Sequence, residues 1–173
     1  MALNQGRLTW RHDGIVNYIA QCVDTSKFSI YADVPEFNTP AGGTIPPSLT
    51  VTSDKPDIVI IDEKKKAVAI FELTVPFEHN IETRNTAKNA KYEHLKEEIT
   101  NYKTQIVAFE IGARGYISRE NRKRLKNIYK YCKTEIRLKE FEENIARLII
   151  NASYHIYLSR DQTEGATPSL FSP

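Results

Sequence analysis

At 173 residues the chain can bury one good hydrophobic core, and it is too short for two domains of ordinary size. Charged residues make up 27% and hydrophobic residues 40%, as in soluble globular proteins, and no apolar run approaches the roughly 20 residues that cross a bilayer. We therefore expect no membrane partner, one domain over residues 1–158, and a loose tail over residues 159–173, where Thr, Ser, Gly and Pro accumulate.

The start of the chain lacks the apolar stretch of a secretory signal. The two cysteines, Cys22 and Cys132, lie far apart in segments with helical patterns, so we expect two buried thiols in a reducing environment. These features predict a protein that is not secreted and that is intracellular, and nuclear if the host is eukaryotic.

The first half of the chain predicts one helix and three strands. Apolar residues spaced by three and four indicate an amphipathic helix at the start, and Asp13 is placed to be its N-cap. A β-rich strand, a long loop with Pro and Gly, and two strands joined by a tight charged turn follow. In chain order these elements cover residues 11–23, 28–34, 35–53, 58–61 and 67–71.

The second half alternates helical and β patterns. A stripe that recurs every three or four residues predicts a helix that begins with Lys88 and Lys91 and becomes apolar farther on. A strand and two more helices follow, and the four elements cover residues 81–102, 105–111, 118–132 and 141–156. The strand-helix-strand step favours a parallel pair, so the predicted fold class is α/β, a mixed sheet flanked by helices with extra C-terminal helices.

Two acids occupy corresponding ends of neighbouring predicted strands. Asp57 follows Lys55-Pro56 and begins one strand, and Glu72 stands near the end of the next. The tight turn between the strands suits an antiparallel hairpin, which brings these ends together. Carboxylates on adjacent strands form sites for divalent metals, so the pair predicts a metal-dependent hydrolytic centre.

A basic segment lies between Arg114 and Lys139. It holds ten basic residues, whereas Glu120 and Glu135 are its only acids. Such an excess suits a phosphate backbone, because each cation placed on a phosphate releases a condensed counterion. The alternative is an ordinary solvated helix face. The candidate nucleic-acid contacts in this segment are Arg114, Arg119, Arg122, Lys123 and Lys126.

Four blocks of residues resemble a known family. They read LTWRHDGIV at 8–16, KPDIV at 55–59, ELTVPF at 72–77 and KNAKY at 88–92. The acid pattern within them resembles the PD-(D/E)XK nuclease superfamily of restriction endonucleases and junction resolvases. The four blocks in this order are similar to the restriction-like endonuclease domain of non-LTR retrotransposons, which resembles Holliday-junction resolvases and nicks target DNA. The resemblance implies a restriction-endonuclease-like αβββαβ core.

The resemblance also implies how a metal is held. Asp57 and Glu72, with the backbone carbonyl of Leu73, are expected to bind Mg²⁺ or Mn²⁺, because hard cations prefer oxygen ligands. In the superfamily a lysine lies two residues after the second acid, but here that residue is Thr74. The retrotransposon domains move this lysine to the following helix, which implies that Lys88 or Lys91 supplies the charge.

Four further residues in the matching blocks are site candidates. Asp13 and His12 are expected to approach the metal or the phosphate, although a helix cap and a core histidine are the ordinary alternatives. Arg11 is a candidate nucleic-acid contact, and Tyr92 is expected to pack or hydrogen-bond beside the lysine or to contact nucleic acid. The solvated surface of a helix is the ordinary alternative for Lys88 and Lys91.

Two functions from different classes remain open. The first is a metal-dependent DNA endonuclease whose substrate is DNA, branched or associated with RNA, and which acts as a monomer or a homodimer. The second is a catalytically inactive nucleic-acid-binding module derived from such a nuclease, which the Thr74 substitution supports.

Overall fold

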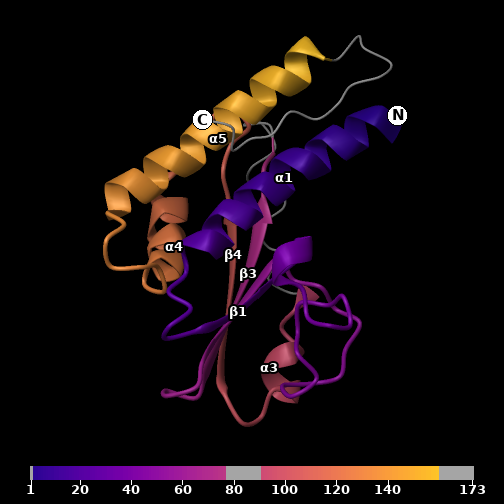
Figure 1. Cartoon of the computed structure of the whole chain (residues 1–173), viewed down its shortest axis with the longest axis vertical. Coiled ribbons are helices and arrows are strands. Elements are labelled where there is room, and N and C mark those ends of the chain that lie inside the picture. Colours follow the sequence, from indigo (N-terminus) through magenta and orange to yellow (C-terminus); the bar gives the residue numbers. More distant parts are fainter. Residues whose placement is uncertain (1, 77–90, 160–173) are drawn as a thin grey trace.

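The computed structural model describes residues 2–76 and 91–159, which form a four-stranded sheet with helices on both faces (Figure 1). The strands are β1 (Ser29–Ala32), β2 (Ile58–Asp62), β3 (Ala67–Thr74) and β4 (Lys103–Glu110). They lie in the order β1-β2-β3-β4, in which the first two pairs are antiparallel and β3 runs parallel to β4. This topology confirms the predicted α/β class and the mixed sheet.

The helices of the described residues are α1 (Ala2–Cys22), α3 (Leu95–Glu98), α4 (Arg119–Tyr129) and α5 (Leu138–Leu158), with a short 3-10 turn, η1, at Pro35–Phe37. Figure 1 shows α1 and α5 side by side, with α4 beside the sheet. Within the described parts of the chain, no helix is both long enough and apolar enough to cross a membrane.

Alternation along the strands sends side chains into two apolar clusters, one on each face of the sheet. Ile60 of β2 and Phe71 of β3 pack with residues of α1, α4 and α5, such as Ile15 and Phe141. The residues of the other cluster define what we call the α3 face: Ile45, Val59, Ile61, Val68, Ile70, Tyr92, Leu95 and Ile99. The two faces of the sheet therefore pack against different elements, and alternate residues of each strand point to opposite faces.

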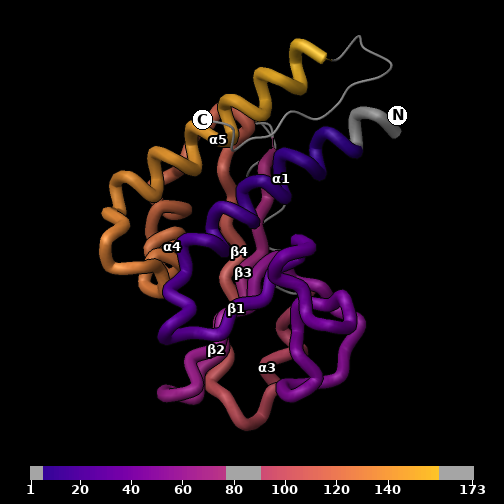
Figure 2. The backbone as a smooth tube through the Cα atoms, in the orientation of Figure 1, coloured from indigo at the N-terminus to yellow at the C-terminus, as the bar shows by residue number. Residues whose placement is uncertain are grey.

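The long loop between β1 and β2 lies over the α3 face, as Figure 2 shows. Thr50 Oγ1 donates a hydrogen bond to Glu98 Oε2 at 3.2 Å. Nε2 of His94 lies 2.7 Å from Oδ2 of Asp54. The loop predicted from Pro and Gly is confirmed, and these contacts hold its last part against α3.

A tight turn joins β2 to β3. Oδ1 of Asp62 accepts a hydrogen bond from the amide of Lys65 at 3.0 Å, and Lys66 has a φ of 47°, in the left-handed region. The turn fixes the pairing of Ile58 with Phe71 and of Asp62 with Ala67. It therefore lies at the opposite end of the hairpin from Asp57.

The first helix begins earlier than predicted, and Asp13 is not its N-cap. α1 starts at Ala2, so Asp13 lies in the middle of the helix. The early residues lack apolar periodicity, but the guanidinium of Arg7 donates a hydrogen bond to the carbonyl of Ser159, at the end of α5. A tertiary contact of this kind stabilises a helix that local periodicity does not reveal.

The predicted helix over residues 81–102 is wrong in its second half. Residues 92–94 form a turn, α3 has only four residues, and Ile99 leaves the helical region with φ −87° and ψ 73°. The chain then enters β4, where the amide of Lys103 donates to the carbonyl of Lys66 at 2.8 Å. The hydrogen bonds of strand pairing therefore determine the backbone here, and the predicted helix does not continue. The other predicted elements agree to within a few residues at their ends, and residues 77–90 and the tail from 160 lie outside the described residues.

Candidate functional site

The structure brings Asp57 and Glu72 together at one end of the sheet. Asp57 immediately precedes Ile58, which pairs with Phe71, so Asp57 stands opposite Glu72. Oδ2 of Asp57 accepts a hydrogen bond from the amide of Leu73 at 2.6 Å, and the amide of Asp57 lies 3.4 Å from Oε2 of Glu72. Both residues are buried, with exposed fractions of 8% and 6%. Two carboxylates that are removed from bulk water and placed this close favour a cation between or beside them.

His12 reaches this acid pair from the middle of α1. Its Nε2 lies 3.2 Å from Oδ2 of Asp57, and its Nδ1 lies 3.1 Å from Oδ1 of Asp13. Burial alone lowers the pKa of His12, but hydrogen bonds and Coulombic attraction from Asp13 and Asp57 outweigh it and raise the pKa to about 10. His12 is therefore an imidazolium at neutral pH, and it balances part of the negative charge of the site.

Tyr92 also lies close to the acid pair, on the α3 face. Its side chain is fully buried on the α3 face, and its hydroxyl donates to the carbonyl of Lys55 at 3.2 Å. Burial and the nearby carboxylates Glu72, Asp57 and Asp54 raise the pKa of Tyr92, so the phenol stays protonated. The buried ring leaves no surface for stacking a base.

Lys91 is the predicted catalytic lysine that falls within the described residues. Its ammonium donates a hydrogen bond to the hydroxyl of Tyr92 at 2.5 Å and lies 4.4 Å from the centre of the Tyr92 ring. The side chain is exposed, so it retains access to solvent and to a ligand. Tyr92 thus lies between Lys91, which it contacts, and the carboxylate of Glu72, which is near its hydroxyl. The contact with Lys91 is the one predicted for Tyr92. Lys88 lies outside the described residues.

Thr74 occupies the position of the lysine that the superfamily pattern contains. It follows Glu72 by two residues, so both side chains face the same side of β3. Its register partner on β4 is Glu110, which is only 2% exposed, and the amide of Glu110 donates to Oδ1 of Asn121 at 2.9 Å. Glu110 is therefore buried, although it lies on an edge strand, where a glutamate is ordinarily exposed to solvent. In the sequence, Glu110 alternates with Ile106 and Ala108, and this alternation could have indicated that its side chain points to the same covered face.

Arg11 is a buried structural residue rather than a surface cation. It is 4% exposed, and its guanidinium donates to Oγ of Ser153 and to the carbonyl of Val75, both at 2.9 Å. These bonds join α1 to α5 and to the segment after β3. The placement does not support the prediction that Arg11 contacts nucleic acid directly.

The five basic candidates of the segment after β4 are all exposed: Arg114, Arg119, Arg122, Lys123 and Lys126. Four of them are on α4, whose buried residues Leu125 and Ile128 pack against the cluster opposite the α3 face. Glu72 alternates with Val68 and Ile70 and so faces the α3 face. The structure therefore places the basic helix and the acid pair on different faces of the sheet.

The donor atoms of the acid pair fit a hard divalent cation. Among the described residues, no group of three or more His, Cys, Asp and Glu side chains is arranged to hold a metal ion. Mg²⁺, however, commonly takes only one or two carboxylates and completes its shell with water and substrate phosphate. The buried carboxylates of Asp57 and Glu72 meet that requirement. Leu73 contributes its amide to this group, and the role of its carbonyl stays a prediction.

No model of a known protein family matches the chain, and no curated protein matches it in sequence. The resemblance to retrotransposon endonuclease domains thus depends on the four blocks of residues quoted above.

Proposed function

We propose that this protein is a divalent-metal-dependent DNA endonuclease with a restriction-endonuclease-like core, similar to the nuclease domains of non-LTR retrotransposons. The observation that carries the proposal is the burial of Asp57 and Glu72 side by side at the ends of β2 and β3. Two such carboxylates need a structural reason or a ligand, because buried charge is unfavourable without a partner. The order of elements around them, helix, three strands, helix and strand, supports the same assignment.

In this proposal Asp57, Glu72 and the carbonyl of Leu73 hold Mg²⁺ or Mn²⁺. When bound, the cation would activate a water molecule and neutralise charge on the scissile phosphate. Lys91 or Lys88 stabilises the negative charge that develops on the phosphate, and Tyr92 positions Lys91 through the hydrogen bond to its hydroxyl. His12 and Asp13 adjust the charge around Asp57. The substrate is DNA, branched or associated with RNA, and a nuclear location follows if the host is eukaryotic.

A second candidate is a catalytically inactive nucleic-acid-binding module. Two observations favour it: Thr74 replaces the lysine of the superfamily pattern, and the imidazolium of His12 lies against Asp57. A histidine that permanently neutralised Asp57 would leave the acid pair with little affinity for a metal. Cleavage activity separates the two candidates.

The test is cleavage of supercoiled plasmid and of branched oligonucleotides with Mg²⁺, with Mn²⁺ and with a chelator. The endonuclease proposal predicts metal-dependent nicking that falls at least roughly a hundredfold in Asp57→Asn and in Glu72→Gln. Asp62→Asn is the matched control, because Asp62 is also buried but caps the turn at the far end of β2. Binding without cleavage under all conditions would support the inactive module, and cleavage that survives Asp57→Asn would overturn the assigned site.

A further inference from the structure

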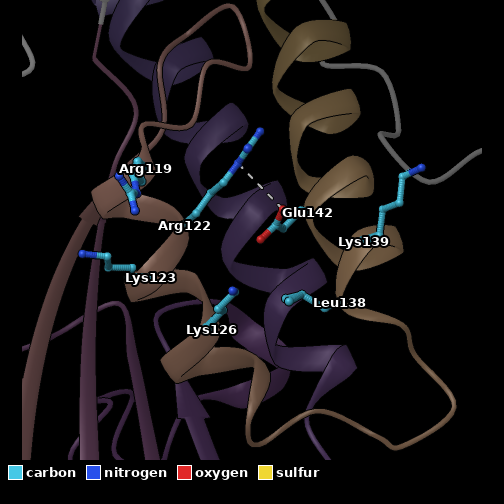
Figure 3. A pocket seen from close by; sticks show the side chains of 7 residues that line it. All are labelled: Arg119, Arg122, Lys123, Lys126, Leu138, Lys139 and Glu142. Atoms are coloured by element: carbon cyan, nitrogen blue, oxygen red, sulfur yellow. Dashed lines mark ion pairs between the residues drawn. The ribbon is translucent and has the colours of Figure 1, made fainter.

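A groove between α4 and α5 has the charge of an anion-binding surface. Its main cavity, of about 470 Å³, is lined by five cations, Arg119, Arg122, Lys123, Lys126 and Lys139, with Glu142 as the one acid among its lining residues (Figure 3). Leu138 is the only apolar residue of that lining. A lining of this kind suits a charged ligand, because a single leucine is a small anchor for a lipid chain.

The groove is longer than one phosphate. A neighbouring cavity of about 310 Å³ shares Arg122, Lys139 and Glu142 with the main cavity and continues along α5 to Ala146 and Gly115. It adds a second acid, Glu143, so the positive charge is concentrated in the main cavity. The two cavities meet where Nε of Arg122 lies 3.9 Å from Oε2 of Glu142, the ion pair drawn in Figure 3. The shape therefore suits an extended polyanion better than a single small anion.

The cations of the groove are poorly neutralised within the protein. Arg119, Arg122, Lys123 and Lys126 recur at spacings of three and four on α4 and so share one side of the helix, where like charges repel by a few tenths of a kcal/mol for each pair. Arg122 and Glu142 stand at the outer limit of ion-pair distance. Lys123 pairs with exposed Glu120 at 3.3 Å, and Lys139 pairs with exposed Glu143 at 3.6 Å. Within the described chain, no carboxylate forms an ion pair with Arg119 or Lys126. Exposed pairs of this kind contribute little and exchange readily for phosphate.

The groove begins near the acid pair even though it lies on the other face of the sheet. The amide of Glu110 donates to Asn121 in the first turn of α4, and Glu110 is paired with Thr74, two residues beyond Glu72. A nucleic acid that leaves the acid pair around the edge of β4 would meet the start of α4 first and the rest of the groove next. Polynucleotide backbone is therefore a ligand that both surfaces fit.

We propose that the groove between α4 and α5 binds the phosphate backbone of the nucleic-acid substrate at a distance from the scissile phosphate. The choice of nucleic acid as the polyanion rests on the proposed function. Arg119 and Arg122 offer planar guanidinium groups, which bind phosphate oxygens in pairs, and Lys126 and Lys139 add point charges. Glu142 opposes binding and sets an upper limit on the affinity of the groove.

The experiment is fluorescence anisotropy of a labelled DNA duplex with the full chain, in chelator so that no cleavage occurs, over a series of salt concentrations. Each phosphate contact contributes about 0.9 to the slope of log affinity against log salt concentration. Arg122→Gln combined with Lys126→Gln should therefore lower that slope by about 2 and weaken binding at low salt about tenfold or more. Lys64→Gln combined with Lys65→Gln removes the same charge from the exposed β2–β3 turn, whose residues line neither cavity, and should leave the slope unchanged.

Glu142→Gln supplies a test that loss of folding cannot imitate, because it should tighten duplex binding several-fold by removing the repelling charge. The inference is overturned if the groove variant keeps the wild-type slope, or if the turn variant loses as much duplex affinity as the groove variant. It is also overturned if Glu142→Gln weakens duplex binding, or if the wild-type protein binds anionic vesicles through these residues and binds no duplex. Because the assay contains no divalent metal, its result is separate from cleavage. If Asp57→Asn loses nicking activity while the groove variant binds duplex as tightly as wild type, the endonuclease proposal stands and the groove proposal is wrong.

Discussion

Nε2 of His12 lies 3.2 Å from Oδ2 of Asp57, so the middle of α1 is joined to the residue that immediately precedes β2. The same oxygen of Asp57 accepts the amide hydrogen of Leu73. A single carboxylate thus connects a helix and two strands, and its charge is shared between a cation and a backbone dipole. This relationship links the stability of the fold to the chemistry proposed for the site.

The first prediction concerns His12→Gln, which keeps a hydrogen-bonding group but removes the positive charge. In chelator, at neutral pH, the variant should lose about 1–2 kcal/mol of free energy of unfolding, because two carboxylates lose their cation. The folded pKa of His12, about 10, lies above the ordinary value of 6.5. The stabilisation by wild-type His12 is therefore complete below about pH 6.5 and declines as the pH rises towards 10.

Urea unfolding of both proteins across this pH range measures the difference. The gap between wild type and His12→Gln should narrow steadily on the alkaline side of neutrality. A gap that stays constant up to pH values near 10 would show that the proton on His12 does not contribute to folding.

The second prediction separates Arg11 from the exposed arginines. Arg11→Lys should lower the free energy of unfolding by about 2 kcal/mol, because lysine cannot reach Ser153 and the Val75 carbonyl at the same time. Arg147→Lys, on the exposed side of α5, should change it by less than about 0.5 kcal/mol. Duplex binding by the folded Arg11→Lys protein should match that of wild type, and a loss of affinity without a loss of stability would restore Arg11 as a nucleic-acid contact.

The third prediction identifies the catalytic lysine. Lys91→Ala or Lys88→Ala should lower the rate of metal-dependent nicking by roughly a hundredfold or more, because a pre-placed cation supplies much of the transition-state stabilisation. The two single variants are compared in the same plasmid assay. If both retain full activity, the idea that the lysine has moved from the Thr74 position to the following segment is wrong.

The fourth prediction is a rescue. Thr74→Lys places an ammonium two residues after Glu72, on the same face of β3 and beside Glu110. In the background of the inactive lysine variant, it should recover at least about tenfold in nicking rate. Thr74→Met, which adds a similar volume without a charge, is the control, and equal recovery by both would indicate packing rather than charge.

The fifth prediction concerns the two cysteines, which are both free and buried. Burial raises the pKa of Cys22, and burial with the nearby Cys22 raises the pKa of Cys132 to about 12, so both remain thiols at neutral pH. A thiol reagent should therefore react slowly with the native protein and rapidly with two groups in concentrated guanidinium chloride. Rapid native labelling would mean that the contact between the end of α1 and Cys132 opens readily.

The meeting of Asp57 and Glu72 could be predicted because it depends only on local features. The alternation of each strand and the tight turn between them fix the register, and a hairpin has no freedom to separate opposite residues. The position of Arg11 could not be predicted in this way. Its partner Ser153 lies 142 residues away in the sequence, and nothing in either segment indicates that they meet.

The errors elsewhere have the same origin in nonlocal contacts. The stripe through Leu95 and Ile99 does face the core, but burial of these side chains is compatible with a turn and a single helical turn as well as with a long helix. Glu110 is on an edge strand, where exposure is the ordinary expectation, but Asn121 from α4 covers its backbone. The periodicity of apolar residues indicates which side chains are buried. Tertiary packing determines the backbone conformation in which they are buried.

The turn from Asp62 to Lys66 gives this small protein a natural attachment point. The turn is separated from the acid pair by the length of β2, and none of its residues lines the groove. A cysteine introduced at exposed Lys64 could carry a dye or a surface linker while both proposed nucleic-acid surfaces stay open to solution. Single molecules tethered there would display binding and nicking on one DNA strand as separate events.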